Sequence, residues 1–232
     1  NDDFGLKSKY INQETLFLTN IGLIKNKKND NFIKKNLPIN EEVYFNELIS
    51  KSLYNYSYQW DQAINKYLRF GMNYFLTQDF KLRFKRFWNN SENAIKAIKE
   101  RISNIDKCFL EFAPRNQKKK NIFYRGMKEK YDFNNDNSII LTSFTSVSRN
   151  LDAALKFHDI NTRCCIYQVT LDIGIPYINM INNTQFKNEK EVLLPRNLVA
   201  KLIGQEIKYY NKKPGSRVYT LFKIHLSKMN KE

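Results

Sequence analysis

A change of hydrophobic pattern near Pro114 constrains the fold of this 232-residue chain more than any other feature. Before Pro114, apolar residues recur at three- and four-residue spacing, which is typical of amphipathic helices. After it, short runs rich in β-branched and aromatic residues favour strands. The predicted helices span residues 40–54, 59–70 and 91–110, with a later one at 151–157. The predicted strands span residues 122–125, 139–144, 164–171, 192–194, 198–207 and 217–224.

These segments favour a single domain of the α+β class. Gly71 is a plausible C-terminal stop for the second helix, and Asn150 is a plausible N-cap for the last one. The sequence shows neither an internal repeat nor a linker long enough to demand independent domains, so we expect one domain over residues 1–232. A mainly helical part would cover about 1–112, and a β-rich part about 121–232.

The net charge of +16 has two interpretations. It is compatible with a polyanionic partner such as nucleic acid or an anionic membrane. However, Lys and Asn are abundant from end to end, and the short basic clusters lie in loop-like contexts. We therefore favour a solvated, lysine-rich surface. An acidic protein partner would be attracted by the same field, so the charge does not identify a target.

Cysteine and histidine usage bears on the compartment and on metals. Three cysteines, two of them adjacent at Cys164 and Cys165, cannot build a disulfide framework, which suits a reducing compartment. Two histidines and no cysteine pair at ligand spacing predict no zinc site. The chain shows neither a signal peptide nor an apolar run long enough to cross a bilayer.

Common nucleotide and hydrolase motifs are missing, which narrows the candidate chemistry. The seven glycines are scattered, so they form neither a dinucleotide fingerprint nor a P-loop. The two histidines have no local signature of a serine-protease-like triad. The remaining candidates are a close pair of carboxylates, an arginine at a strand end and a run of hydroxyl side chains.

Glu189 and Glu191 are the carboxylate pair. In an extended chain, residues two apart point to the same face, so both carboxylates would share one pocket. Two negative charges so close together are unfavourable unless each is stabilised by a partner or is needed for function. The alternative is a turn with two exposed acids.

The arginine and the hydroxyl run are the other two candidates. Arg125 ends an apolar strand and offers a rigid charged fork that suits phosphate or ribose oxygens, and Gly126 permits close backbone approach. The hydroxyl run covers residues 142–148, and its side chains can hold a carboxylate in one orientation. The alternatives are a surface arginine on an edge strand and ordinary turn and cap hydroxyls.

The order and spacing of these motifs resemble the arginine–serine–glutamate class of mono-ADP-ribosyltransferases. The matching segments are Tyr124-Arg125-Gly126, Ser146-Val147-Ser148 and Glu189-Lys190-Glu191-Val192-Leu193-Leu194-Pro195. The resemblance extends to residues 64–69, which look like the family's N-terminal helix, and it covers about Tyr54 to Ile207. It implies that Asn65 and Ser148 belong to the NAD-binding set. It also implies helices packed on a mixed, mainly antiparallel β-sandwich, with NAD+ in the cleft between the sheets.

The resemblance also implies a role for each remaining motif residue. Glu191 would stabilise the positive charge on the ribose when the nicotinamide bond breaks, and Ser146 would hold that carboxylate. Arg125 would anchor the diphosphate or the adjacent ribose of NAD+, and the Gly126 backbone would bind the carboxamide of nicotinamide. Phe157 would stack on the nicotinamide ring. NAD+ is a substrate in this scheme, and no metal is needed.

Glu189 points to the acceptor of ADP-ribose. In the family, glutamate at this position goes with arginine targets, and a carboxylate pairs bidentately with a guanidinium group. The loop at 182–188, with Phe186 near its tip, would meet the target protein. Actin and small GTPases are possible targets at the level of the family. The pattern suggests a secreted toxin or effector that acts in the cytosol of a host cell.

Three other functions remain open. An NAD+ glycohydrolase would use the same residues with water as the acceptor, and would not need Glu189. A nucleic-acid modifier fits the charge but not a glutamate at position 189, and we expect no nucleic-acid partner. A basic binding module would tolerate Glu191→Gln. A poly-ADP-ribose or diphtheria-like enzyme is disfavoured, because that branch has a histidine where this chain has Arg125.

Overall fold

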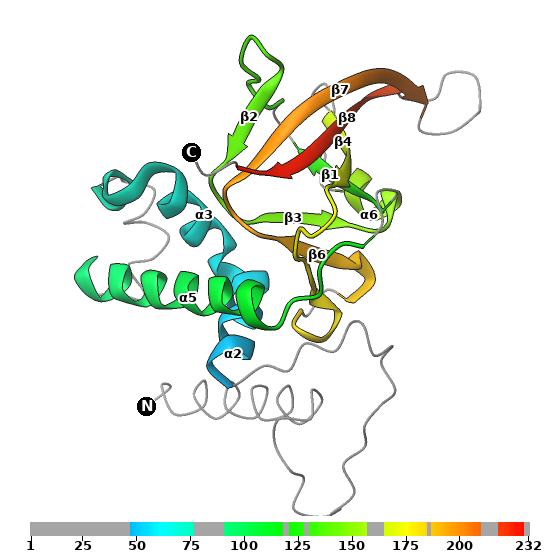
Figure 1. The fold of residues 1–232 in the computed structure, drawn as a ribbon. Coiled ribbons are helices and arrows are strands. Elements are labelled where there is room, and N and C mark those ends of the chain that lie inside the picture. The colour runs from blue at the N-terminus through cyan, green and yellow to red at the C-terminus, as the bar shows by residue number, and fades with distance from the viewer. Residues whose placement is uncertain are drawn as a thin grey trace, which may run out of the picture.

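Helices fill the N-terminal part of the chain and strands the C-terminal part (Figure 1). The computed structural model describes residues 47–76, 91–117, 121–127, 130–156, 165–184, 187–209 and 218–229. The helical segments are α2 (Glu47–Asn55), the π-helical turn η1 (Tyr56–Trp60), α3 (Asp61–Phe70), the 3-10 segment η2 (Gly71–Leu76), α5 (Ser91–Glu111) and α6 (Leu151–Lys156). The strands are β1 (Ile122–Met127), β2 (Ser138–Leu141), β3 (Thr145–Ser148), β4 (Cys165–Leu171), β5 (Ile178–Asn179), β6 (Glu191–Leu194), β7 (Leu198–Tyr209) and β8 (Val218–Lys228).

The helices form where the apolar spacing predicts them. The helix expected at 91–110 is α5, and most of the one expected at 59–70 is α3. Gly71 follows α3 with a φ of 59°, a conformation that glycine adopts at little cost. Asn150 caps α6, since its side-chain oxygen accepts a hydrogen bond of 3.0 Å from the backbone N–H of Asp152. Residues 40–46 of the first predicted helix lie outside the described residues.

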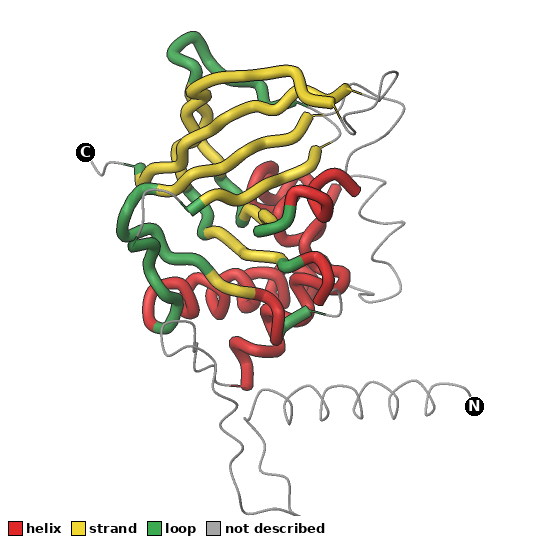
Figure 2. The backbone as a smooth tube through the Cα atoms, turned by 90° about the vertical axis from the view of Figure 1, so that its right-hand side faces the viewer, coloured by secondary structure: helices red, strands yellow, loops and turns green. Residues whose placement is uncertain are grey.

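The strands join into one mixed eight-stranded sheet in the order β2-β7-β8-β4-β1-β3-β6-β5. The β4–β8 pair is parallel and the other pairs are antiparallel, as the sequence resemblance implies. The two halves of the sheet meet only at Tyr124 and Ser148, where β1 touches β3. This narrow junction lets the β3-β6-β5 half turn away from the rest, and the expected two-layered core is therefore built from one continuous sheet (Figures 1 and 2).

The strand prediction at 139–144 is wrong in one respect. β2 ends at Leu141, and residues 145–148 of the hydroxyl run form the separate strand β3. Phe144 explains the break, because its fully buried ring packs against Tyr56 and Phe109 in the helical core. The chain turns between β2 and β3 to bury this ring. As a result, the two strands have different partners: β2 pairs with β7, and β3 pairs with β6. The two-residue strand β5 was not predicted, since it is too short to show a pattern.

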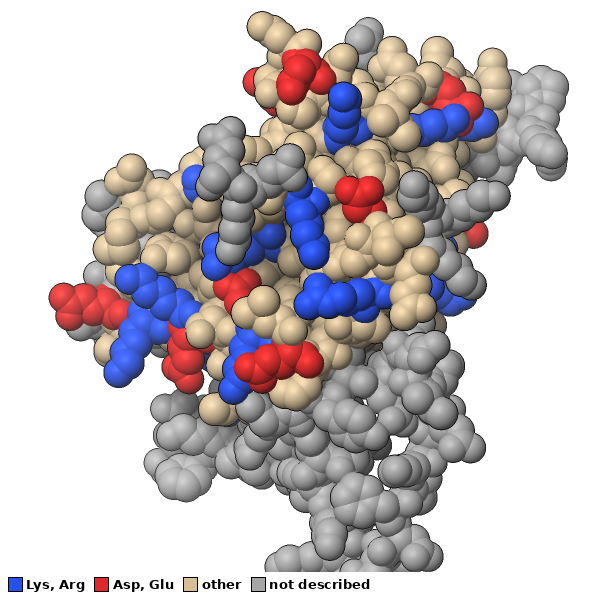
Figure 3. Space-filling model, viewed as in Figure 1, with Lys and Arg blue, Asp and Glu red and all other residues tan. Residues whose placement is uncertain are grey.

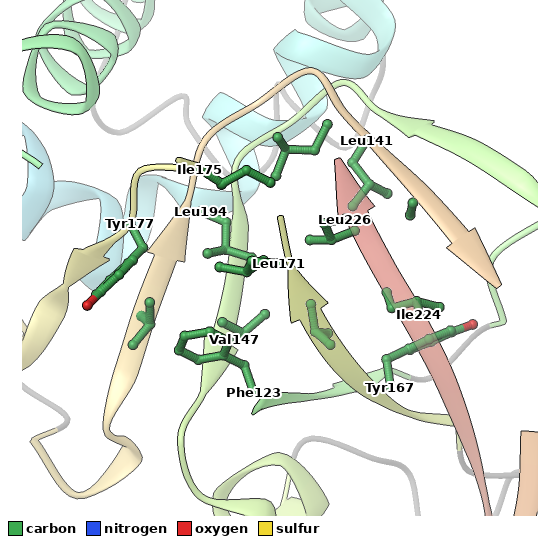
Figure 4. Packing of buried hydrophobic residues seen from close by; sticks show 14 of the residues in the cluster. Phe123, Leu141, Val147, Tyr167, Leu171, Ile175, Tyr177, Leu194, Ile224 and Leu226 are labelled. Atoms are coloured by element: carbon green, nitrogen blue, oxygen red, sulfur yellow. The ribbon is translucent and has the colours of Figure 1, made fainter. Parts of the chain in front are cut away.

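Two large apolar cores, beside a smaller cluster around Leu155 and Ile166, hold these layers together. The first lies among α2, α3 and α5, and residues from the β5–β6 end of the sheet close it, including Ile178 and Leu193. The second fills the concave side of the sheet and includes Phe123, Val147 and Tyr167 (Figure 4). Complete burial of one such side chain is worth about 1.5–3 kcal/mol. The helical part is thereby fixed against β3 and β6, the strands that carry Ser146 and Glu191.

The surface is basic but mixed in sign. On the face shown in Figure 3, Lys and Arg side chains alternate with Asp and Glu rather than forming one large patch of a single sign. This agrees with the interpretation of the +16 charge as a solvated surface on that face. Within the described ranges, no helix is long and apolar enough to span a membrane.

Candidate active site

The motif residues of the sequence converge on one cavity of about 510 Å³. It lies where the η1–α3 segment approaches β1, β3 and the start of β6. Its lining residues are Ser57, Asp61, Asn65, Tyr124, Arg125, Gly126, Ser146, Val147, Ser148, Ala154, Glu189 and Glu191. The structure thus brings together seven of the nine candidate residues. The other two, Phe157 and Phe186, lie outside the described residues.

A second hollow of similar size shares no lining residue with this cavity. It measures about 520 Å³ and lies along α3 and α5, where Arg196 forms a bidentate ion pair with Asp106. Asp106 and Arg196 are thus already paired with each other within the wall. We place the candidate site in the first cavity because convergent polar groups with unsatisfied atoms mark a functional pocket better than volume does.

Glu189 and Glu191 reach the cavity by a route that the sequence did not predict. An extended chain was expected, but Glu189 ends the 3-10 turn η4 (Lys187–Glu189) and only Glu191 belongs to β6. Between them, Lys190 adopts a left-handed conformation with a φ of 47°. This turn, rather than strand alternation, directs both side chains to the same cavity. The expected convergence is therefore present with a different backbone cause.

Ser148 fastens this turn to the sheet. Its hydroxyl donates a hydrogen bond of 2.6 Å to the backbone carbonyl of Glu189 and accepts one of 2.9 Å from the backbone N–H of Asn150. In the β3–β6 ladder, Ser148 is also the partner of Glu191. One buried side chain therefore connects β3, the Glu189 turn and the start of α6.

Arg125 enters the cavity from β1. Its Nη1 atom donates a hydrogen bond of 2.5 Å to the backbone carbonyl of Ser146, which fixes the guanidinium group against β3. Its Nε atom is buried and has no hydrogen-bond partner among the residues that the structure describes. A buried donor without a partner is costly, and such an atom commonly points to a missing ligand group.

A row of polar side chains leads from α3 toward Glu191. The Asn65 side-chain amide donates to the hydroxyl of the buried Tyr56 over 2.9 Å. The Ser146 hydroxyl is close enough to the Tyr56 hydroxyl and the Glu191 carboxylate to favour the ionised form of each. Because an ionised carboxylate only accepts hydrogen bonds, a proton donated between Ser146 and Glu191 would come from the Ser146 hydroxyl. Within the described part of the chain, the side-chain oxygen of Asn65 is buried without a hydrogen-bond partner.

The three carboxylates of the cavity have raised pKa values, and burial is the first cause in each. The pKa of Glu191 rises to about 6, because burial and the negative charges of Glu189 and Asp61 outweigh the Ser146 hydrogen bond and the positive charge of Arg125. Burial also raises the pKa of Glu189, opposed by the charge of Lys156. Within the described residues, no three His, Cys, Asp or Glu side chains are arranged to hold a metal ion.

Sequence reasoning missed the residues that α3 and η1 bring to the cavity. Asp61 and Ser57 lie four and eight residues before Asn65, and a spacing of four places residues on one helical face. That spacing could have found them once Asn65 was chosen. Tyr56 is fully buried and looks like an ordinary core aromatic in the sequence, so only its hydrogen bonds reveal it.

The helical layer and mixed sheet together form the ADP-ribosyltransferase fold. No protein-family model matches the sequence, and the comparison with curated proteins finds no match either. The likeness is therefore visible in the structure rather than in overall sequence identity.

Three solved structures illustrate this likeness. BECa, an ADP-ribosylating toxin of C. perfringens solved with NADH, matches with a TM-score of 0.55 at 20% identity over 78% of this chain. The match spans only 44% of BECa. Plx2a, an ADP-ribosyltransferase toxin from Paenibacillus larvae, has a TM-score of 0.55 at 15% identity, over 79% of this chain and 87% of its own. The ADP-ribosyltransferase Vis, in complex with agmatine, has a TM-score of 0.52 at 16% identity, over 93% and 84%.

Proposed function

We propose that this protein is an NAD+-dependent mono-ADP-ribosyltransferase that modifies an arginine of a target protein. The observation that carries the proposal is the meeting of Arg125, Ser146, Glu189 and Glu191 in one cavity of a chain with the ADP-ribosyltransferase fold. Fold alone does not fix function, so the chemistry of these groups has to support it.

The cavity has the polar groups that NAD+ requires. The Arg125 guanidinium group lines the cavity, is permanently charged and has an Nε atom without a partner among the described residues, which suits a diphosphate oxygen. The unpartnered oxygen of Asn65 is an acceptor that suits a ribose hydroxyl. Gly126 lines the same cavity beside Arg125, and its backbone is accessible to the carboxamide of nicotinamide. These unsatisfied atoms support NAD+ as the substrate.

Glu191 would stabilise the transition state of the cleavage step. The bond between the anomeric carbon of the ribose and the nicotinamide nitrogen breaks, and its electron pair leaves with nicotinamide. Positive charge then develops on the ribose, and an ionised carboxylate held nearby stabilises that charge. The Ser146 hydroxyl orients Glu191 for this task.

Glu189 would recognise and activate the acceptor. A guanidinium nitrogen of the target arginine forms the new bond to the anomeric carbon, and the proton it loses passes to the Glu189 carboxylate and then to water. Carboxylate and guanidinium groups match in charge and geometry. Vis was solved with agmatine, which carries the same guanidinium group. The target would be a protein, with actin and small GTPases as candidates, and the enzyme would act as a secreted toxin or effector in host cytosol.

Labelled NAD+ and a eukaryotic cell lysate test the proposal. Wild-type protein should label a lysate protein and release nicotinamide, and Glu191→Gln should abolish both. Glu189→Gln should abolish labelling but retain nicotinamide release, because water needs no carboxylate at that position. Glu111→Gln, an exposed substitution on α5, is the matched control and should behave as wild type.

The outcomes separate the competing functions. Nicotinamide release by wild type without any labelled protein would favour an NAD+ glycohydrolase. Labelling that withstands hydroxylamine treatment selective for arginine adducts would contradict the arginine assignment. A protein that neither binds nor cleaves NAD+ would overturn the proposed function and leave the basic binding module.

A further inference from the structure

The cavity is acidic although the chain is strongly basic. Three carboxylates, those of Asp61, Glu189 and Glu191, line it together with a single guanidinium group, that of Arg125. The chain as a whole carries a net charge of +16. An excess of negative charge inside a basic protein favours a cationic group in the cavity. The acceptor arginine explains Glu189, and the ribose cation explains Glu191, but neither role explains the third carboxylate.

Asp61 is placed on a wall different from that of the two glutamates. It is the first residue of α3 and shares a helical face with Asn65, one turn further on. Glu189 and Glu191 come from η4 and β6 instead. The positive charge of Arg125 lowers the pKa of Asp61, and the negative charge of Asp61 raises the pKa of Glu191. Asp61 is therefore near the group that the proposed chemistry places beside the reacting ribose.

Retaining a charge at Asp61 is unfavourable for the fold. Burial raises the pKa of Asp61, which means that the folded protein disfavours the ionised form. An asparagine would have nearly the same shape without this cost. A half-buried carboxylate beside Glu191, in the same cavity, is thus a candidate for a functional role.

We propose that Asp61 is a further catalytic residue, which acts with Glu191 to stabilise the positive charge at the nicotinamide–ribose end of NAD+. This inference rests on the proposed NAD+ cleavage. The nicotinamide ring is cationic in the substrate, and the positive charge moves to the ribose as the bond breaks. A carboxylate on each wall stabilises that charge more than one carboxylate does, because two negative charges act on it. Both are held in place by the fold, so no solvent reorganisation is needed at the moment of reaction.

The first test measures nicotinamide release and thermal unfolding for wild type, Asp61→Asn and Asp61→Glu. Asp61→Asn should lower kcat roughly tenfold to a hundredfold, and Asp61→Glu should recover part of it. Hydrolysis and transfer should fall alike, because the loss precedes the choice of acceptor. The melting temperature of Asp61→Asn should equal or exceed that of wild type, whereas a structural role predicts a decrease. Asp132→Asn, an exposed substitution, is the matched control and should change nothing.

A second test uses binding alone and does not depend on turnover. NADH carries a neutral dihydronicotinamide ring, so the ratio of the dissociation constants of NADH and NAD+ reports selection for the cation. In a Glu191→Gln background, adding Asp61→Asn should lower this ratio several-fold. If Asp61→Asn fails to fold, Asp61→Ser replaces it in both tests.

The failures of the two hypotheses are distinguishable. Wild-type kcat and an unchanged NADH-to-NAD+ ratio in the Asp61 variant would overturn the role of Asp61 and leave the proposed function standing. A wild-type protein that neither binds NAD+ nor releases nicotinamide would overturn both.

Discussion

Ser148 donates its only hydroxyl proton to the backbone carbonyl of Glu189, over a distance of 2.6 Å. The same oxygen accepts a hydrogen bond from the backbone N–H of Asn150. The sequence resemblance assigned Ser148 to the NAD-binding set, but a hydroxyl with its proton in use cannot also donate to a ribose. We therefore expect Ser148 to act mainly on the position of the Glu189 turn.

Ser148→Ala should separate transfer from cleavage. Without the hydroxyl, the carbonyl of Glu189 and the N–H of Asn150 lose a partner, which should lower the free energy of unfolding by about 1–3 kcal/mol. The Glu189 side chain should lose its fixed position, whereas Glu191 keeps its ladder partner. Labelling of a target protein should fall more than nicotinamide release, as measured in one assay. An equal loss of both activities would contradict this role.

The pKa of Glu191, raised to about 6, predicts the acid limb of the activity profile. Glu191 stabilises the ribose cation only when its carboxylate is ionised. The rate of nicotinamide release should therefore fall as the pH decreases through about 6. A profile of kcat/KM from pH 5 to pH 8 checks this. An acid limb near 4 would show that Glu191 is less buried in solution, or that another group controls the rate.

The same shift predicts how stability depends on pH. The folded-state pKa of Glu191 lies above the unfolded-state value of about 4.3. Ionised Glu191 therefore costs the fold free energy above pH about 6, and this cost disappears below about 4. Glu191→Gln should raise the free energy of unfolding by about 1–2 kcal/mol at pH 8 and leave it unchanged at pH 4. Urea titrations at both pH values measure the difference, and a decrease at pH 8 would contradict the assignment of burial as the cause.

The structure brings together the polar strand residues that the sequence predicts for the candidate site. Arg125, Ser146, Glu189 and Glu191 all line one cavity, because each lies at a strand or beside one and strand pairing collects them. Their order along the chain was sufficient to indicate a shared site. The backbone conformation between the two glutamates was not predictable. Lys190 adopts a left-handed conformation, whereas glycine and asparagine are the residues from which this conformation is usually predicted.

The helical side of the site was harder to predict for a physical reason. Tyr56 and Asp61 lie on helical segments whose pattern is dominated by apolar residues that face the core, such as Ile64. A tyrosine in such a pattern is read as core packing, and an aspartate is read as a solvated position. Phe144 was predicted to belong to a strand, but its ring packs in the helical core against Tyr56 and Phe109.

Tyr56→Phe should make the position of the Glu191 carboxylate less fixed without creating a cavity in the core. The substitution keeps the buried ring but removes the link between Asn65 and Ser146. Stability should fall by about 1 kcal/mol, and kcat for nicotinamide release should fall about threefold to tenfold. Because the link runs through Ser146, Tyr56→Phe should cost little further activity in a Ser146→Ala background. Additive losses in this double-mutant cycle would show that Tyr56 does not act through Ser146.

Arg125→Lys should show whether geometry as well as charge binds the dinucleotide. Lysine keeps the positive charge but has no second nitrogen to contact NAD+ while the first holds the Ser146 carbonyl. The dissociation constant of NAD+ should rise about tenfold or more, which corresponds to about 1.4 kcal/mol. NADH shares the same diphosphate, so its dissociation constant should rise by the same factor, unlike in the Asp61 variants. A rise in the dissociation constant of NAD+ but not of NADH would show that Arg125 acts at the nicotinamide end of the site rather than at the diphosphate.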